Sequence, residues 1–378
     1  MREKIYDIEA LRCFSIIAVI LQHIDHLFPY PIPIIGAIHH YLGGGFGVDL
    51  FLTVSGFLVA QSLITKLESR NTFNQKIQIV IDFWVKRMWR LWPAAWTCLA
   101  VILVCVIFFN ESNSFGSLSA NIDASIAGFF HFANFRFYST FLQSEYGVSF
   151  VYWSLSLEEQ FYFLFPIILI LLPKNKALYF VTICIALQIF TARSQNLLLI
   201  FFRTDAIMLG VVIAYIHQKK MQLFLADKIK THNNNYYKIL LILSLLLMSL
   251  LTGGELISQY KYSWLAIISF SLVFIASLNL DKFSAKPSVK NIILWFGRHS
   301  YSIYLTHIPV YYITREVVFK LSQNNITNIN NSWLYIAIAL LLIPSVAHCS
   351  YKYIENPLRI YGKKLNNKNL RASPYEHP

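Results

Sequence analysis

The chain has 378 residues, of which 56% are hydrophobic and only 13% are charged. Ordinary soluble domains hold about 45–50% apolar and about 25% charged residues, so this composition excludes a disordered chain, a coiled coil and almost any soluble enzyme. The formal net charge is +13, but the basic residues stand between apolar blocks, which is typical of an inner-membrane protein. The five cysteines show no metal-type spacing, so we interpret them as small hydrophobic residues and expect no metal site.

Apolar segments that approach or reach the length of a membrane span follow one another along the chain. A bilayer core about 30 Å thick requires about 20 mostly apolar residues in a helix. Ten candidate spans meet or approach this length: 8–29, 45–66, 86–109, 149–172, 177–193, 197–217, 237–253, 262–280, 296–319 and 332–354. The sequence therefore predicts an all-α, polytopic transmembrane helix bundle of about ten spans, which forms one domain over residues 1–360. The apolar segment 123–138 is too short to span, and we expect it to be interfacial or re-entrant.

The distribution of basic residues predicts the orientation. If the N-terminus is cytoplasmic, the inner segments hold 26 Lys and Arg residues and the outer segments hold five. Basic residues stay preferentially on the cytoplasmic side, so we expect both termini to be cytoplasmic. Residues 361–378 then form a short basic cytoplasmic tail.

Two ionisable side chains share one face of the first predicted span. Arg12 and His23 are 11 residues apart, which is about three helical turns and about 16 Å along the axis. Ionisable groups inside a bilayer are costly and often mark function. The alternative is an arginine that extends to the interface and a histidine that lies in it; the shared face favours a functional role for His23.

The second and third spans carry further candidates. Asp49 lies near the outer edge of the second span, with Ser55 and Gly56 nearer its middle. Arg87 and Arg90 stand three residues apart near the cytoplasmic end of the third span, so they project from one face and can bind phosphates. The alternatives are close helix packing for Gly56 and topological anchoring for the two arginines.

Later spans add adjacent carboxylates and a second histidine. Glu158 and Glu159 point about 100° apart on a helix, so we expect that they do not serve one pocket equally. At least one of them should be paired or protonated, and a structural ion pair is the alternative. Arg203 and Asp205 lie in the sixth span, and His307 lies near the middle of the ninth.

Arranged by depth, these residues predict a basic mouth at the inner surface and a titratable cluster in the outer half of the membrane. The mouth contains Arg12, Arg87 and Arg90, and the cluster contains His23, Asp49, Glu158, Glu159, Arg203 and Asp205.

Seven motifs occur in a fixed order along the chain. They are Arg12 with His23 eleven residues later, DLFLTVSGF at 49–57, RMWR at 87–90, WSLSLEEQFY at 153–162, RTDAIMLG at 203–210, SYSIYLTHIP at 300–309 and YIENPLR at 353–359. As an ordered set they resemble the acyltransferase 3 family of integral membrane O-acyltransferases, which modify extracytoplasmic glycans and related acceptors. Leu52 is a mild departure, because the family often has a second phenylalanine there.

The resemblance implies an acyltransferase that transfers groups other than aminoacyl groups. Its co-substrate would be a cytoplasmic acyl-CoA, usually acetyl-CoA, with no permanently bound cofactor and no metal. His23 would be the catalytic base or the first acceptor of the acyl group, and Glu158 would orient it or share its proton. The residues expected to bind substrates are Arg12, Asp49, Ser55, Gly56, Arg87, Arg90, Arg203, Asp205 and His307; Ser55 is expected to bind the thioester carbonyl, with a covalent carrier role as the alternative.

The expected partners are the lipid bilayer, an acyl-CoA and a glycan or lipid-linked sugar acceptor, with no nucleic acid; a homo-oligomer stays open. The expected location is the inner or plasma membrane, crossed several times. A second class of function is a transporter or flippase without covalent chemistry, which buried charges also suit. Against it, we find no matched pair of Gly- or Pro-broken spans in two halves of the chain.

Overall fold

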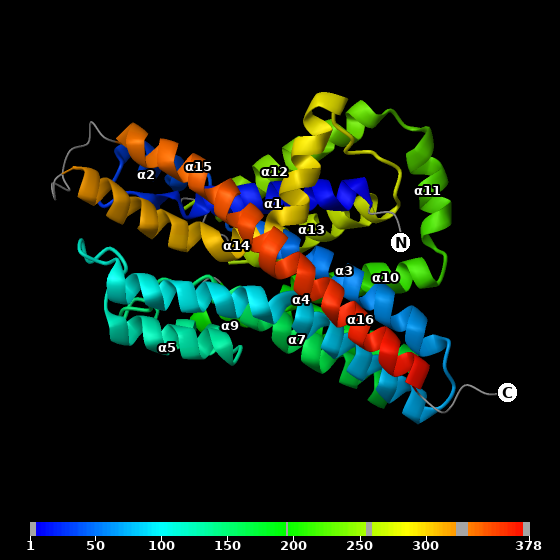
Figure 1. Ribbon diagram of the computed structural model, residues 1–378. Coiled ribbons are helices and arrows are strands. Elements are labelled where there is room, and N and C mark those ends of the chain that lie inside the picture. The colour runs from blue at the N-terminus through cyan, green and yellow to red at the C-terminus, as the bar shows by residue number, and fades with distance from the viewer. Residues whose placement is uncertain (1–4, 194–195, 255–258, 323–331, 373–378) are drawn as a thin grey trace.

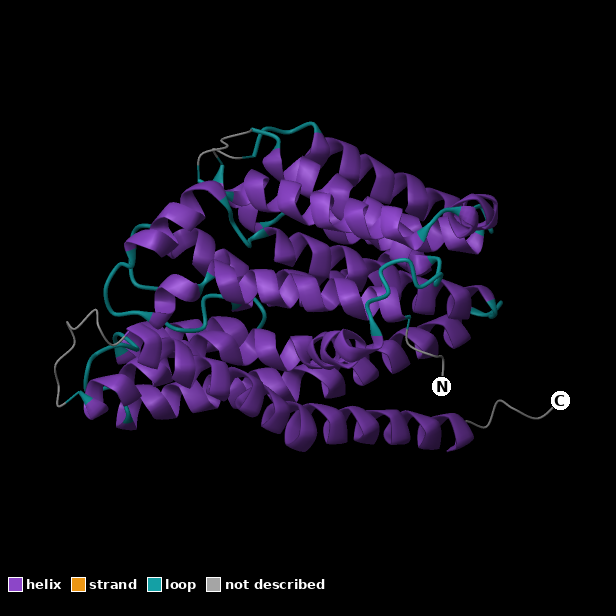
Figure 2. Ribbon diagram, turned by 90° about the horizontal axis from the view of Figure 1, so that it is seen from above, coloured by secondary structure: helices purple, strands orange, loops and turns teal. Residues whose placement is uncertain are grey.

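The protein is a bundle of long helices that run side by side (Figures 1 and 2). The computed structural model describes residues 5–193, 196–254, 259–322 and 332–372, and over these ranges it contains helices and no strand. The helices are α1 (Tyr6–Gln22), the 3-10 turn η1 (Ile24–Leu27), α2 (Pro33–Tyr41), α3 (Phe46–Glu68), α4 (Phe73–Phe108), α5 (Leu118–Phe129), α6 (Ala133–Thr140), α7 (Tyr152–Leu171), α8 (Lys174–Ile189), α9 (Leu197–Phe201), α10 (Asp205–Gln218), α11 (Gln222–Thr231), α12 (Asn234–Thr252), α13 (Lys261–Ser277), α14 (Pro287–Leu321), α15 (Ser332–Ser350), the π-helical turn η3 (Tyr351–Glu355) and α16 (Asn356–Ala372).

Each of the ten predicted spans overlaps helical structure, although 197–217 is divided between α9 and α10. Six helical segments of the described chain are long and apolar enough to cross a membrane: Phe46–Glu68, Phe73–Phe108, Tyr152–Leu171, Leu197–Gln218, Asn234–Thr252 and Ser332–Leu365. Two predicted spans correspond to shorter apolar helices, Asn175–Ile189 and Lys261–Ser277. The remaining two fall in α1 and α14, which carry charged residues. The prediction of an all-helical, multi-pass membrane protein is therefore confirmed, whereas the number ten stays a prediction.

The beginning of α1 and the end of α16 point toward the same end of the bundle, and α2 lies at the opposite end (Figure 1). The residues predicted to begin a tail continue the helix α16 without a break at 360. This helix packs on α4, where Tyr361 meets the ring of Trp89 with centroids 4.9 Å apart. A Cβ on Gly362 would come within 2.5 Å of Trp89, so glycine permits the close approach.

The segment 123–138 forms a helical hairpin, α5 and α6, whose tip enters the bundle. At the tip, the carbonyl of His131 accepts a hydrogen bond from Gln160 Nε2 at 2.8 Å. The backbone N–H of Ala133 donates to Ser156 Oγ at 3.1 Å. Gln160 lies eight residues beyond the start of α7, which is about 12 Å along its axis. This depth favours the re-entrant alternative over the interfacial one.

Small residues bring α3 and α10 close together. A Cβ on Gly56 would collide with the carbonyl oxygen of Ile207, and one on Gly210 would collide with the carbonyl of Thr53. Glycines at such positions let helix backbones approach in a membrane. Gly56 therefore serves helix packing, the alternative that the sequence offered for it, and the expectation that it binds substrate stays a prediction.

Candidate functional site

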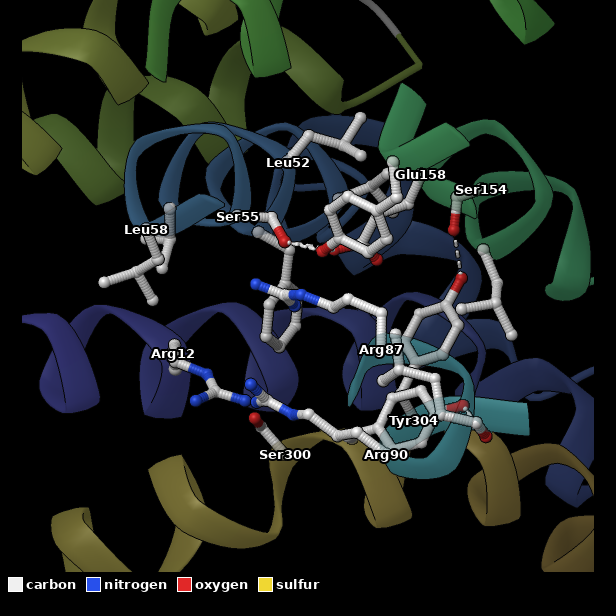
Figure 3. A pocket seen from close by; sticks show the side chains of 17 residues that line it. Arg12, Leu52, Ser55, Leu58, Arg87, Arg90, Ser154, Glu158, Ser300 and Tyr304 are labelled. Carbon is white, nitrogen blue, oxygen red and sulfur yellow. Dashed lines mark hydrogen bonds between the residues drawn. The ribbon is translucent and has the colours of Figure 1, made fainter. Parts of the chain in front are cut away.

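Five helices, α1, α3, α4, α7 and α14, converge on a pocket inside the bundle (Figure 3). We call it the arginine pocket. Its polar lining consists of Arg12, Ser55, Arg87, Arg90, Ser154, Glu158, Tyr162, Ser300, Tyr301 and Tyr304. The sequence-predicted residues Arg12, Ser55, Arg87, Arg90 and Glu158 thus meet in one place.

Three guanidinium groups point into this pocket, and those of Arg12 and Arg90 approach Ser300 (Figure 3). Within the described chain, Arg90 Nε and Ser300 Oγ are buried without a hydrogen-bond partner. Arg87 lies over the ring of Tyr162, 4.6 Å from its centroid. Arg12 also lies 3.7 Å from Glu9 Oε1. The three cations, with the unpaired Nε of Arg90, form a site for an anionic group, because guanidinium groups bind phosphates and carboxylates with charge-assisted hydrogen bonds.

The arginines lie level with the carboxylates, which differs from the expected separation by depth. The reason is the antiparallel register of α4 and α7. Tyr152 donates its hydroxyl hydrogen to the carbonyl of Ala95 at 2.9 Å, and Trp84 Nε1 donates to the carbonyl of Tyr162 at 3.1 Å. This register places Arg87 and Arg90 beside the 158–162 turn of α7.

Glu158 lies in a hydrogen-bonded group with two hydroxyls. Both Ser55 and Tyr162 donate to its Oε1. Glu159 instead accepts from Trp92 Nε1 at 3.1 Å and lines a different pocket. The expectation that adjacent carboxylates do not share a pocket equally is therefore confirmed. In the structure these hydrogen bonds of Glu158 go to Ser55 and Tyr162, and the expectation that Glu158 orients His23 stays a prediction.

A second pocket lies toward the other end of α1, and we call it the histidine pocket. His23, the residue that ends α1, lines it together with Asp49 and Arg203. The wall also has aromatic and basic side chains: Phe137, Phe141, Trp153, Phe201, Lys261 and Tyr262. Val48 and Tyr304 line both this pocket and the arginine pocket. The two pockets are therefore neighbours that share a wall.

His23 pairs with the second predicted histidine. Its Nδ1 lies 3.2 Å from Nε2 of His307, and the ring centroids are 5.3 Å apart. His307 is fully buried on α14, at 0% exposure. It contacts His23 and is not among the residues that line the two pockets, and its expected role in binding substrate stays a prediction.

The remaining predicted charges form two buried ion pairs. Arg203 binds Asp49 through two hydrogen bonds, Nε to Oδ1 at 2.9 Å and Nη2 to Oδ2 at 3.1 Å. Arg193 Nη2 donates to Asp205 Oδ2 at 2.7 Å. Asp49 and Arg203 belong to the wall of the histidine pocket, whereas Asp205, at 0% exposure, holds Arg193 within the bundle. The sequence did not predict that Asp205 pairs with Arg193.

Sequence reasoning also missed Tyr162, Ser300 and Tyr304. Their helical spacing from residues that were predicted could have identified them. Ser300, Tyr304 and His307 follow one another at four and three residues, so they share a face of α14. Tyr162 stands four residues after Glu158 on α7 and shares its face in the same way.

Taken together, the fold and the two pockets define a multi-pass membrane protein with a buried polar site. Residues 5–348 match the family model of acyltransferase 3, described as an acyltransferase domain. The chain therefore belongs to the acyltransferase 3 family, as the motifs indicate.

Known proteins similar to this chain include two bacterial enzymes. It is 26% identical over 388 residues to peptidoglycan O-acetyltransferase OatA of Listeria monocytogenes, covering 96% of this chain and 57% of that protein. It is 27% identical over 405 residues to O-acetyltransferase OatA of Staphylococcus aureus, covering 96% of this chain and 59% of that protein. The chain thus spans less than two thirds of the length of these relatives. No solved structure matches the chain.

Proposed function

We propose that this protein is a membrane O-acyltransferase that moves an acetyl group from cytoplasmic acetyl-CoA to a hydroxyl group of an extracytoplasmic glycan. The observation that carries the proposal is the shared wall of the two pockets, formed by Val48 and Tyr304. On one side are the anion-binding arginines, and on the other is His23. Membership of the acyltransferase 3 family and relatives named O-acetyltransferases support covalent chemistry over transport.

The arginine pocket suits the phosphate-bearing donor. Arg12, Arg87 and Arg90 would hold the phosphates of CoA, each charge-assisted hydrogen bond contributing about 1.5–3 kcal/mol. The thioester end would then reach toward Tyr304. Ser55 would donate to the thioester carbonyl oxygen once its hydroxyl turns away from Glu158, which accepts from it in the structure.

The histidine pocket suits the acceptor. Its aromatic side chains offer apolar faces to a sugar ring, while His23 and Arg203 supply the polar contacts that fix orientation. A glycan is favoured as the acceptor because one relative is named for the O-acetylation of peptidoglycan.

In the proposed transfer step His23 acts as the base. The imidazole takes the proton of the acceptor hydroxyl while the hydroxyl oxygen bonds to the carbonyl carbon of the acetyl group. The carbon–sulfur bond of the thioester breaks, and the thiolate of CoA leaves. The imidazolium returns the proton to the thiolate, so the products are the O-acetyl ester and CoA thiol. Attack by the imidazole itself, followed by transfer from an acetyl-histidine, is the alternative order.

The proposal is tested by measuring acetyl transfer by the purified full chain in lipid vesicles. The probes are acetyl-CoA labelled in the acetyl group and soluble peptidoglycan fragments. We expect labelled ester on the fragments and release of CoA thiol in equal amounts. A folded protein that neither binds acetyl-CoA nor releases CoA would overturn the proposal and leave the transporter alternative.

A further inference from the structure

We infer that His307 is a positioning residue that fixes the tautomer of His23, so that the unprotonated nitrogen of His23 is Nε2. The inference rests on the proposed function, in which His23 acts as base or acyl acceptor. It assigns to His307 a role in catalysis that acts through another residue.

The backbone of α14 fixes the tautomer of His307. His307 Nδ1 lies 2.8 Å from the carbonyl oxygen of Tyr304 and 3.3 Å from that of Ile303. A carbonyl oxygen only accepts hydrogen bonds, so His307 Nδ1 must carry a hydrogen. His307 is fully buried and has no carboxylate partner within the described chain, and an unpaired buried charge is costly. A neutral ring with its hydrogen on Nδ1 leaves Nε2 as an acceptor.

The contact between the two rings then determines the tautomer of His23. His307 Nε2 lies 3.2 Å from His23 Nδ1. Because His307 Nε2 can only accept here, His23 Nδ1 must donate. A neutral His23 then has its lone pair on Nε2. This nitrogen is the one available to take a proton or an acyl group.

The neighbours of His23 hold its ring in this contact. Phe150 packs edge-on against it at 5.4 Å between centroids, and the backbone of Val19 forms a hydrogen bond with it. A base that is oriented by a third group is a recurring arrangement in nucleophilic catalysis, where the orienting group is usually a carboxylate. Here a second imidazole, anchored to two main-chain carbonyls, takes that place.

A second histidine pair, His299 of α14 and His348 of α15, serves as a control. His299 Nδ1 lies 2.8 Å from the carbonyl of Trp295, and His299 Nε2 lies 3.3 Å from Nδ1 of His348. This pair repeats the geometry of His307 and His23, but it lies outside both pockets. Breaking it tests whether the loss of any paired histidine harms the protein.

The first measurement needs no variant of His307. In vesicles containing the full chain with ¹⁵N-labelled histidine, nitrogen chemical shifts distinguish protonated from unprotonated ring nitrogens, and the His23→Gln variant identifies the signals of His23. We expect Nδ1–H and a bare Nε2 for His23 above the pH at which it titrates. An Nε2–H tautomer in the wild-type protein would overturn the inference.

The second measurement compares two substitutions. His307→Leu removes the acceptor, whereas the amide oxygen of His307→Gln still accepts from His23 Nδ1. With acetyl-CoA and peptidoglycan fragments, we expect His307→Leu to lower kcat at least tenfold with an unchanged KM for acetyl-CoA. We expect His307→Gln to recover most of this loss and His348→Leu to behave as wild type.

The outcomes separate this inference from the proposed function. If His23→Ala keeps full turnover, the assignment of His23 fails and the proposed chemistry fails with it. If His23→Ala is inactive but His307→Leu keeps the wild-type kcat and pH profile, only the role of His307 is overturned. If His307→Leu does not fold, an Nε2–H tautomer of His23 in the wild-type protein still overturns the inference.

Discussion

Val48 of α3 and Tyr304 of α14 each line both the arginine pocket and the histidine pocket. Tyr304 is held firmly, because its hydroxyl donates to the carbonyl of Val151 at 2.7 Å and lies 2.5 Å from Ser154 Oγ. The two side chains therefore stand between the proposed site for the phosphates of the donor and His23. An acyl group that passes from one pocket to the other must pass this wall.

Removing the side chain of Tyr304 from this wall should uncouple the cleavage of acetyl-CoA from acetyl transfer to the acceptor. We expect Tyr304→Ala to raise acceptor-independent release of CoA thiol from acetyl-CoA, because water gains access to the thioester. The measurement is thiol release with and without peptidoglycan fragments. Tyr311→Phe is the control, since Tyr311 lies on the same helix and donates only to the carbonyl of Ile20, at 2.9 Å. Unchanged coupling in Tyr304→Ala would show that the wall does not separate the substrates.

The arginines should act on the donor alone. We expect Arg87→Ala combined with Arg90→Ala to raise the KM for acetyl-CoA tenfold or more, since each lost charge-assisted hydrogen bond is worth about 1.5–3 kcal/mol. The KM for the acceptor should stay unchanged. Arg298→Ala, an exposed arginine of α14, is the matched control. An unchanged KM for acetyl-CoA together with poor membrane insertion would make the pair topological anchors instead.

His23 should be required for turnover but not for donor binding. We expect His23→Ala to lower kcat by about 10²–10⁴, the usual worth of a general base, while acetyl-CoA still binds. A base must be unprotonated to act, so wild-type activity should rise with pH through the titration of His23 and be lost as pH falls.

The control for His23 is His26→Ala. His26 Nδ1 lies 3.0 Å from the hydroxyl of Tyr312, away from His307, so its loss should matter much less. A fully active His23→Ala beside an inactive His26→Ala would place the catalytic face of this region elsewhere.

Breaking the buried ion pair of Asp49 and Arg203 should destabilise the protein more than replacing both residues does. We expect Asp49→Asn to lower the stability by about 3–5 kcal/mol, because it leaves the guanidinium buried without its counter-charge. The double variant Asp49→Leu with Arg203→Met should be more stable than the single one, since apolar replacement of a whole buried pair is often neutral. Thermal unfolding in detergent measures both. Equal loss in the single and double variants would contradict this.

The orientation can be tested from the two ends of the bundle. α2 and α11 lie at opposite ends (Figure 1). With Cys349 replaced by serine, we expect an impermeant thiol reagent applied to intact cells to label single cysteines placed in 31–42 and to miss those placed in 222–232. Labelling of 222–232 would reverse the predicted orientation.

Much of the fold could be predicted from the sequence. Runs of apolar residues determine where helices cross a membrane, so every predicted span overlaps helical structure. Helical periodicity also predicted that Glu158 and Glu159 face different pockets, as they do. The shared face of Arg12 and His23 stays a prediction, because His23 caps α1 at its end. These are properties of single helices, fixed by 3.6 residues per turn and by the thickness of the bilayer.

The partners of each side chain were decided only by the tertiary structure. His23 and His307 are 284 residues apart, and no local pattern says which helix face another helix will meet. The register of α4 against α7 set Arg87 beside Glu158, because it depends on how the two helices slide along each other. The contact of Gly56 with Ile207 likewise depends on how α3 and α10 pack against each other. Residue type alone shows which side chains are costly to bury in a membrane, whereas helix packing decides which of them meet.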